Sequence, residues 1–325
     1  MKIKAFLIIF LLTLVLLCAS CAQTSESYDV VATIFPGYDF AREIAGEDLS
    51  IKQLLPPGSE SHSYEISARD IIAIQNCKLF ICVGGESEDW VDSILDSMDQ
   101  KPRVIRMMDS VSVLDEEIKE GMDHDHDDHG HDDHSDHDHS DHHHGEGKYD
   151  EHVWTSPENA AMIVQDIRDA MAEQFPESAD SIKANTDEYI AKLGELDSRF
   201  ESLLEDCELC LIFGDRFPLR YFVERYGIDY YAAFPGCSAD SEVSASTVAF
   251  LIDKVKVMNI PTVFHIEFSN HVIADSIAES TGASVAQFYT CHNVSKKQLD
   301  EGATYLSLME ENYRTMEKYI AQIGG

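Results

Sequence analysis

Basic residues are scarce in this chain of 325 residues: 24 lysines and arginines stand against 60 aspartates and glutamates, and the formal net charge is -36. A field of this sign repels the phosphate backbone of a nucleic acid, which excludes nucleic acids as partners. It also disfavours anionic metabolites, whereas it attracts cations. The charge balance therefore favours a cationic ligand, and the length is enough for about two domains of roughly 100–200 residues.

A hydrophobic run long enough to cross a membrane is also missing. The longest apolar stretch, Ala5–Cys18, is too short for a stable anchor and follows two lysines, as in a signal peptide. Small residues stand directly before Cys21, the arrangement that cleavage requires when the new N-terminal cysteine is to carry a lipid. We expect residues 1–21 to be a lipoprotein signal peptide, Cys21 to be the lipid anchor and residues 22–28 to be a tether. Ordinary secretion with cleavage nearby is the alternative, and in either case the mature chain works outside the cytoplasm.

Short apolar runs alternate with amphipathic stretches after the tether, which predicts βαβ units and a parallel sheet. The first four runs are Val30–Phe35, Leu49–Leu55, Lys78–Val83 and a run around Val104. After a helical region, four more runs follow: Leu209–Phe213, Asp229–Ala233, Thr262–Phe268 and Val285–Tyr289. The pattern therefore predicts two α/β lobes, each built on a four-stranded parallel sheet.

One long helix is expected between the lobes, because apolar residues recur at helical spacing over Ser178–Leu204, about seven turns. We therefore divide the mature chain into an N-terminal lobe (29–176), a linking helix (177–206) and a C-terminal lobe (207–325).

A low-complexity insert lies within the N-terminal lobe at residues 123–144, where ten histidines and nine aspartates occur among 22 residues. This composition does not build a core. Imidazole suits zinc, copper and nickel, and a flexible string of imidazoles and carboxylates binds several ions weakly because it must be ordered each time. We expect an auxiliary metal loop made of ten histidines: His124, His126, His129, His131, His134, His137, His139, His142, His143 and His144.

Polar residues follow several of the predicted strands. Ligands of open parallel sheets bind beyond the carboxyl ends of the strands. His62 follows the second strand of the first lobe, and His292 follows the fourth strand of the second lobe. Asp215 follows the first strand of the second lobe, and Glu267 ends the third. A lone histidine is usually a surface residue or a hydrogen-bonded core residue, so His62, His152 and His292 form a candidate site only as a group. His265 and His271 stay unassigned.

Two segments around these histidines resemble the solute-binding lipoproteins of bacterial zinc and manganese ABC importers. Leu55–Glu65 (LPPGSESHSYE) resembles the first metal-ligand segment of that family, and Asp150–Trp154 (DEHVW) resembles the second. The insert lies just upstream of the second segment, where zinc-type members carry theirs. Weaker likenesses at Tyr221–Gly227 and Gly302–Tyr305 extend the resemblance over nearly the whole mature chain.

The resemblance implies a two-lobed fold bridged by a rigid helix, which binds a metal in the cleft and has no enzymatic activity. It implies the permease and ATPase of an ABC importer as partners. It also implies a monomer attached through its lipid to the outer face of the cytoplasmic membrane. Three imidazoles and the insert favour zinc over manganese, which prefers carboxylate oxygen.

Two departures from the family pattern concern the second lobe. The third ligand of the family falls at Arg216, which cannot bind a cation, and the fourth falls at or next to His292. A carboxylate would complete a tetrahedron and offset the charge of the ion. We predict three imidazole ligands and one carboxylate: His62, His152, His292 and either Asp215 or Glu267. The other carboxylate is expected to pair with the Arg216 guanidinium.

Cysteines leave a further choice open. Cys237 and Cys291 each lie in a second-lobe loop expected at the cleft end of the sheet, which makes them a candidate disulfide in an oxidising compartment. In the alternative, Cys291 binds the metal as a thiolate beside His292.

Three other functions compete with a zinc carrier. One is a manganese or other divalent-metal binding protein, and another is an adhesin or metal buffer in which the cleft is secondary. The third is a zinc hydrolase, in which three histidines near Glu267 would hold a metal-activated water. The sequence has no HExxH motif and no serine or cysteine nucleophile motif, which argues against the hydrolase.

Overall fold

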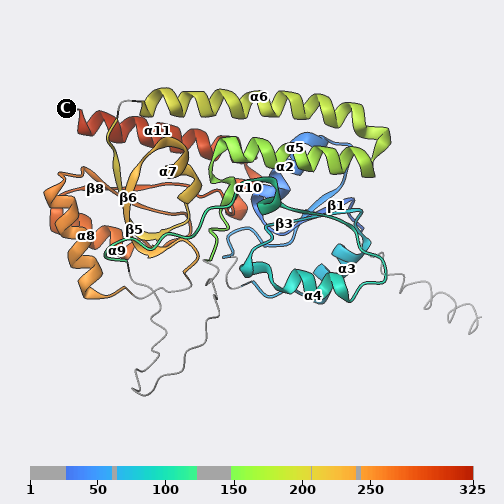
Figure 1. The fold of residues 1–325 in the computed structure, drawn as a ribbon, viewed down its shortest axis with the longest axis horizontal. Coiled ribbons are helices and arrows are strands. Elements are labelled where there is room, and N and C mark those ends of the chain that lie inside the picture. Colours follow the sequence, from blue (N-terminus) through green and yellow to red (C-terminus); the bar gives the residue numbers. More distant parts are fainter. Residues whose placement is uncertain (1–26, 61–63, 123–147, 206, 239–242, 325) are drawn as a thin grey trace, which may run out of the picture.

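The computed structural model describes five stretches of the chain: residues 27–60, 64–122, 148–205, 207–238 and 243–324. Within them the predicted α/β class is confirmed, because the fold contains two four-stranded sheets in which all strands pair in parallel. Figure 1 shows the two sheets side by side, with one long helix running above both.

The first lobe is built on four short strands: β1 (Val30–Ala32), β2 (Ile51–Gln53), β3 (Leu79–Cys82) and β4 (Arg103–Arg106). Their order in the sheet is β2-β1-β3-β4. Its helices are α2 (Phe35–Ala45), α3 (Ala68–Asn76), α4 (Trp90–Asp96) and α5 (Pro157–Gln174). Short 3-10 turns are η2 (Glu86–Glu88), η3 (Met107–Ser110), η4 (Val153–Thr155) and η5 (Pro176–Ser178).

The second lobe repeats the plan, with a longer first and second strand: β5 (Cys210–Phe217), β6 (Asp229–Pro235), β7 (Thr262–His265) and β8 (Ser284–Gln287). Their order is β6-β5-β7-β8. Its helices are α7 (Arg220–Tyr226), α8 (Ala245–Val257), α9 (Val272–Thr281), α10 (Lys296–Asp300) and α11 (Tyr305–Ile323). One strand end differs from the prediction. β5 continues past Phe213 through a shift in its pairing with β6, so Asp215 and Arg216 lie inside the strand instead of after it.

The apolar runs of the first lobe are continuous because its central strands are covered on both faces. In β3, Leu79 and Ile81 belong to the large hydrophobic core, whereas Phe80 and Cys82 pack into a second, smaller cluster with residues of α3 and α4. Neighbouring residues of a strand point to opposite faces, so one strand supplies both cores.

The predicted linking helix is α6 (Ala179–Leu204), 26 residues long. Its buried residues recur every three or four positions along its whole length: Ile182, Thr186, Tyr189, Leu193, Leu196, Phe200 and Leu204. This stripe packs on α2 and α5 of the first lobe and on α7 and α11 of the second. The helix therefore joins the two lobes through one continuous hydrophobic face.

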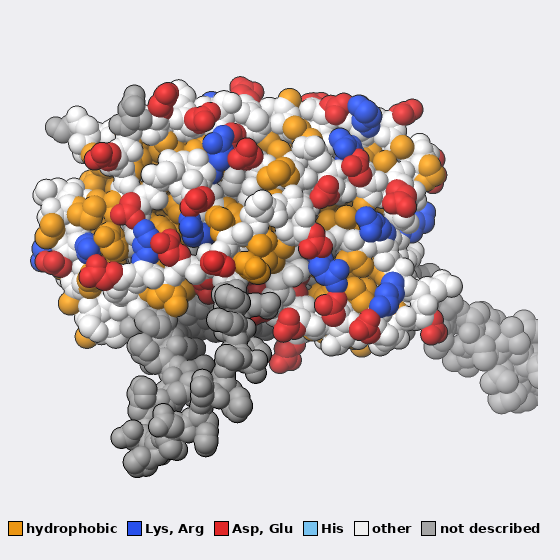
Figure 2. Space-filling model, viewed as in Figure 1, with side chains coloured by type: hydrophobic (Ala, Val, Ile, Leu, Met, Phe, Trp, Pro, Cys, Tyr) orange, Lys and Arg blue, Asp and Glu red, His pale blue; other side chains and the backbone are white. Residues whose placement is uncertain are grey.

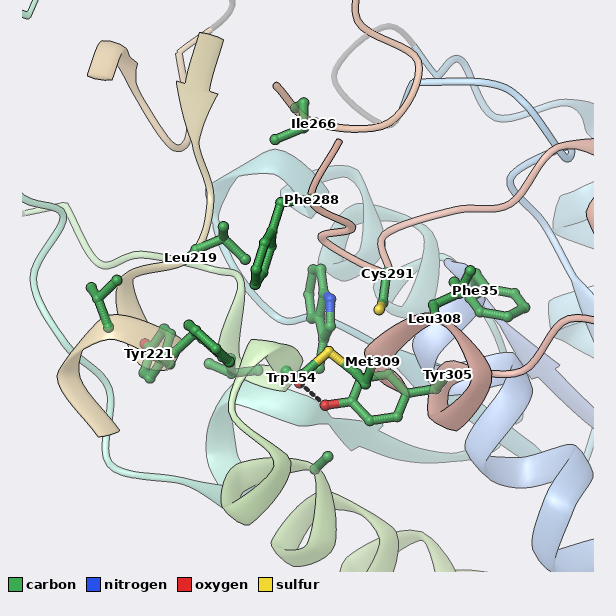
Figure 3. Packing of buried hydrophobic residues seen from close by; sticks show 14 of the residues in the cluster. Phe35, Trp154, Leu219, Tyr221, Ile266, Phe288, Cys291, Tyr305, Leu308 and Met309 are labelled. Atoms are coloured by element: carbon green, nitrogen blue, oxygen red, sulfur yellow. Dashed lines mark hydrogen bonds between the residues drawn. The ribbon is translucent and has the colours of Figure 1, made fainter. Parts of the chain in front are cut away.

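The space between the lobes is filled by a core centred on Trp154, which is 1% exposed. Figure 3 shows its indole surrounded by Phe288, Cys291 and Met309 of the second lobe. The indole Nε1 donates to the carbonyl of Thr290 at 2.9 Å, and the Tyr305 hydroxyl donates to the carbonyl of Trp154 at 2.8 Å. These contacts hold the end of the second family-like segment against the second lobe.

The segment before the insert crosses to the second lobe. The backbone N–H of Leu114 donates to the Tyr221 hydroxyl at 3.1 Å, and the Thr247 hydroxyl donates to the carbonyl of Gly121 at 2.8 Å. Glu117 accepts a hydrogen bond from the Tyr230 hydroxyl at 3.1 Å. This part of the range that we assigned to the N-terminal lobe therefore packs against the C-terminal lobe.

Acidic side chains are spread over the face shown in Figure 2, among fewer basic ones. Ion pairs one turn apart occur on α6, such as Lys183 with Asp187 at 3.0 Å and Lys192 with Glu188 at 2.7 Å. Exposed pairs of this kind contribute little to stability, because water and salt screen them. Among the residues that the structure describes, no helix has both the length and the hydrophobicity needed to cross a bilayer.

Candidate metal centre

A small cavity opens at the carboxyl ends of the strands, between the two lobes. Its volume is about 20 Å³, which is room for a single ion or a water molecule. Eight of the residues that line it are polar or charged and come from both lobes: Ser59, Glu60, His152, Arg216, Glu267, Thr290, His292 and Asn293. The cavity thus lies where the parallel sheets predicted a site, and it brings together three of the five predicted metal ligands, His152, Glu267 and His292.

His152 is buried at the start of η4, with 3% of its surface exposed. Its ring Nδ1 lies 3.1 Å from Oδ1 of Asp150, and its backbone N–H donates to the same oxygen at 2.8 Å. A carboxylate held in this way fixes the orientation of an imidazole and leaves Nε2 as the nitrogen that faces a metal. Burial opposes charging of the imidazole. The Asp150 carboxylate and the Cys237 thiol outweigh this and hold the pKa of His152 well above its usual range.

His292 lies across the cavity, with its ring centroid 5.9 Å from that of His152 and 5.4 Å from that of Trp154. Its loop is braced by Glu267, whose carboxylate accepts hydrogen bonds from the Thr290 N–H at 2.7 Å, the Thr290 hydroxyl at 2.6 Å and the His292 N–H at 3.2 Å. Burial raises the pKa of Glu267, and these hydrogen bonds lower it by less. Glu267 therefore holds the His292 loop in place at the edge of the cavity.

Asp215 occupies a different position from the one we expected. It is not among the residues that line the cavity. Its carboxylate accepts from the N–H of Arg216 at 2.9 Å and from the N–H of Ile266 at 3.3 Å, which ties β5 to the loop after β7. Both oxygens of the Asp215 carboxylate therefore accept hydrogen bonds from backbone N–H groups, which gives this residue a structural role.

The predicted partner of Arg216 is wrong. Its guanidinium pairs with neither Asp215 nor Glu267 but with Glu60 of the first lobe, at 2.9 Å, and it also donates to the carbonyl of Ser238 at 3.4 Å. Successive residues of a strand point to opposite faces, so the side chains of Asp215 and Arg216 diverge. The charge of Arg216 is thus balanced by a salt bridge between the lobes.

His62 lies outside the described residues, but the loop that leads to it is anchored. The side-chain amide of Asn293 donates to the carbonyls of Pro56 at 2.8 Å and Ser59 at 2.9 Å. The N–H of Gly58 donates to the carbonyl of Val294 at 2.8 Å. The chain just before His62 is therefore fastened to the residues just after His292.

One functional candidate in this region was missed as a ligand. Cys237, 8% exposed, follows β6 in the second lobe, and its thiol contacts the imidazole of His152. Asp150, His152 and Cys237 each offer one ligand atom, and these atoms all lie within 4.8 Å of one another. The signal in the sequence was the position of Cys237 beyond a strand, the same signal that selected His292.

The predicted disulfide between Cys237 and Cys291 is absent, because both thiols are free. Cys237 faces His152, whereas Cys291 is fully buried in the hydrophobic core beside Trp154 (Figure 3). Burial raises the pKa of the Cys291 thiol well above its usual range. Among the described residues, no cluster of metal donors includes Cys291, which disfavours the alternative in which Cys291 binds the metal as a thiolate.

The two unassigned histidines lie outside the cavity, as expected. His265 points its Nδ1 at the carbonyl of Ile266, 2.9 Å away, and His271 pairs with Asp275 at 2.8 Å. The predicted lipid anchor Cys21 and the histidines of the insert lie outside the described residues.

The sequence of this chain is similar to those of two curated zinc proteins. The chain is 28% identical over 308 residues to the zinc-binding lipoprotein AdcA of Streptococcus pneumoniae, which covers 94% of this chain and 58% of that protein. It is 30% identical over 306 residues to the high-affinity zinc uptake system protein ZnuA of Bacillus subtilis, covering 91% of this chain and 92% of that one. The chain thus spans somewhat more than half the length of the streptococcal relatives.

Solved structures agree with the fold. The metal-dependent lipoprotein YcdH of Bacillus subtilis superposes with a TM-score of 0.72 at 26% identity, covering 89% of this chain and 98% of that one. The Zn(II)-bound ZnuA-like domain of Streptococcus pneumoniae AdcA gives a TM-score of 0.71 at 24% identity, covering 90% and 99%. The family model described as zinc-uptake complex component A, periplasmic, matches residues 30–319, so this chain belongs to that family.

Proposed function

We propose that this protein is the extracytoplasmic zinc-binding component of an ABC importer, which captures the ion between its lobes and passes it to a membrane permease. The observation that carries the proposal is the pair of imidazoles in the interlobe cavity. His152 is buried and oriented by Asp150, and His292 faces it at a centroid distance of 5.9 Å. Imidazole nitrogens held in this way suit zinc. Membership of the zinc-uptake family supports the same conclusion.

His62 completes the set of three imidazoles in this proposal. It rests on the sequence alone, through the likeness of Leu55–Glu65 to a metal-ligand segment. The anchoring of Pro56 and Ser59 by Asn293 supports it, because the loop that carries His62 starts beside His292. Manganese is the less suitable cargo, since it favours carboxylate oxygens over imidazoles.

Two segments outside the cavity assist the delivery of zinc in this proposal. We propose that Cys21 carries a lipid that holds the protein at the outer face of the cytoplasmic membrane, beside the permease and the ATPase subunit. The insert at residues 123–144, with its ten histidines, would collect zinc weakly and raise its local concentration near the cleft.

A hydrolytic role is disfavoured by the surroundings of Glu267. A general base needs a free oxygen directed at the attacking water. Both carboxylate oxygens of Glu267 instead accept hydrogen bonds from Thr290 and His292. The carboxylate therefore serves the shape of the site, as a carrier requires.

Calorimetric titration of the metal-free protein tests the proposal. We expect one tight zinc site besides weaker ones, and we expect His152→Ala and His292→Ala each to weaken it by at least tenfold, about 1.4 kcal/mol. His271→Ala is the matched control, because that residue is half-exposed and pairs with Asp275 away from the cavity. Equal affinity in the His152→Ala variant and the control would overturn the proposed site.

A further inference from the structure

The second lobe lacks a metal donor at one place where the family resemblance puts it. Arg216 occupies the third ligand position, and its guanidinium is committed to Glu60. Along the same sheet edge, Arg216 pairs in register with Phe234 of β6, and Phe217 pairs with Pro235. Cys237 follows two residues later. The neighbouring strand therefore brings a thiol to the edge from which the third family ligand is missing.

The thiol lies within reach of a ligand. The donor atoms of Asp150, His152 and Cys237 are all within 4.8 Å of one another, and all three residues are at least nine-tenths buried. In a tetrahedral zinc site with bonds of about 2.0–2.1 Å to nitrogen and about 2.3 Å to sulfur, the two donors are about 3.6 Å apart. A small approach of the thiol and the imidazole would accommodate the ion between them.

The turn that carries Cys237 is fixed in place. A Cβ at Gly236 would lie 2.8 Å from the Phe217 carbonyl oxygen and 3.1 Å from Oδ2 of Asp150, so only glycine lets the turn approach this closely. The N–H of Cys237 donates to Oε1 of Glu116 at 2.8 Å. The position of the thiol beside His152 is therefore set by contacts with both neighbouring segments.

The two carboxylates predicted as the fourth ligand already accept hydrogen bonds from the protein. Both oxygens of Asp215 accept from the backbone, and both oxygens of Glu267 accept from Thr290 or His292. Asp150 is used to orient His152. The Cys237 thiol has the imidazole of His152 as its hydrogen-bond partner, so a metal that takes the place of the shared proton would meet both donors.

We propose that Cys237 binds the zinc ion as a thiolate, together with His152 and His292, in place of the third family ligand, whose position Arg216 occupies. The inference rests on the proposed function. On binding, the S–H bond breaks, a Zn–S bond forms and the proton leaves to solvent, with no change of oxidation state. One thiolate reduces the net charge of the site from +2 to +1. Because sulfur is a soft donor, it also favours zinc over manganese.

X-ray absorption at the zinc edge tests the bond directly on the full-length protein loaded with less than one equivalent of zinc. We expect one sulfur scatterer at about 2.3 Å from the ion. The insert contains no cysteine, so zinc held there gives no such signal. A shell of nitrogen and oxygen alone at the tight site would overturn the inference.

The Cys237→Ser variant gives a second readout. With cobalt in place of zinc, the wild type should show a thiolate-to-cobalt charge-transfer band that the variant lacks. The variant should also bind zinc at least tenfold more weakly and discriminate less between zinc and manganese. Cys77→Ser is the matched control, since that thiol is buried in the smaller core of the first lobe and bonds to the carbonyl of Ile74.

The outcomes separate the two proposals. If the wild type has no tight zinc site, the proposed function fails. If the wild type binds zinc tightly through His152 and the variant keeps both the cobalt band and the affinity, the function stands and only the role of Cys237 is rejected. X-ray absorption on the wild type decides the question if the variant does not fold.

Discussion

The two lobes contribute to the cavity in different ways. In the second lobe, Glu267 and His292 come after β7 and β8, so the parallel sheet itself delivers them to the cleft. In the first lobe, His152 arrives on a segment far from any strand end, at the start of η4. Asp150 and the Trp154 core hold it there. Strand ends therefore place the second-lobe residues of the site, as the rule for parallel sheets predicts, whereas tertiary packing places His152.

The largest effect is expected where the two lobes meet. Trp154→Ala should reduce the free energy of unfolding by about 3–5 kcal/mol, because it removes a fully buried indole and leaves the Thr290 carbonyl without its donor. Urea unfolding measures the change. Ile323→Ala, at a residue that is 47% exposed, is the control and should cost less than about 1 kcal/mol. Similar losses in both variants would show that the indole does not join the lobes.

The free energy of unfolding should depend on pH through a buried carboxyl group of the first lobe. Burial raises the pKa of Glu88 to about 7, and hydrogen bonds from the Val83 and Gly84 N–H groups lower it by less. The folded state therefore keeps the proton between about pH 4.5 and 7 while the unfolded chain loses it. This contribution is complete below the unfolded pKa and is lost as the pH rises through the folded pKa.

Thermal unfolding of the metal-free protein from pH 5 to 8 tests that assignment. Stability should fall by up to about 3 kcal/mol across the range, and Glu88→Gln should make the fall shallower. Glu86→Gln, at an exposed neighbour in the same turn, should leave the wild-type profile unchanged. A steeper fall in Glu88→Gln than in the wild type would contradict the sign.

The orientation of His152 is the next test. Asp150→Asn removes the charge that holds Nδ1 of the imidazole, so zinc affinity should fall by about 10–100-fold, as for other carboxylates behind a metal-bound histidine. Calorimetric titration measures it. Asp169→Asn, on the exposed side of α5, is the control. If the two variants bind zinc equally well, packing alone positions His152.

The smallest effect is expected from deleting residues 123–144. The chain on either side is held by the pairing of Asp115 with Tyr149 and by the contacts of Leu114 and Gly121 with the second lobe. The deletion should therefore leave the tight zinc site within about twofold and remove only weaker binding. Calorimetry that shows loss of the tight site would mean that the insert supplies one of its ligands.

Periodic features were predictable from the sequence. The stripe over Ser178–Leu204 predicted α6 (Ala179–Leu204), and the eight apolar runs predicted the eight strands. Each of these signals is local, because burial of one face imposes a period on neighbouring residues. The boundary of β5 was missed because a shift in pairing between Phe213 and Arg216 lets the strand continue past its apolar run.

The partners inside the site were harder to predict. Arg216 meets Glu60, and Cys237 meets His152, across wide gaps in the chain and between different lobes. No local pattern records such pairs, since they depend on how the lobes are packed. From the topology, we expected Cys237 and Cys291 both to lie at the cleft end of the second sheet. The observed side chains diverge, because one turns toward His152 and the other into the core.

The length of α6 has a mechanical consequence. At about 1.5 Å per residue, the 26 residues of α6 span about 39 Å. The buried face of the helix packs against both lobes along this length. Moving the lobes apart would require either that the seven turns of the helix bend or that its buried face lose contact with one of the lobes. The helix therefore resists separation of the two lobes. The salt bridge from Glu60 to Arg216 is a second link between the lobes, at the edge of the cavity.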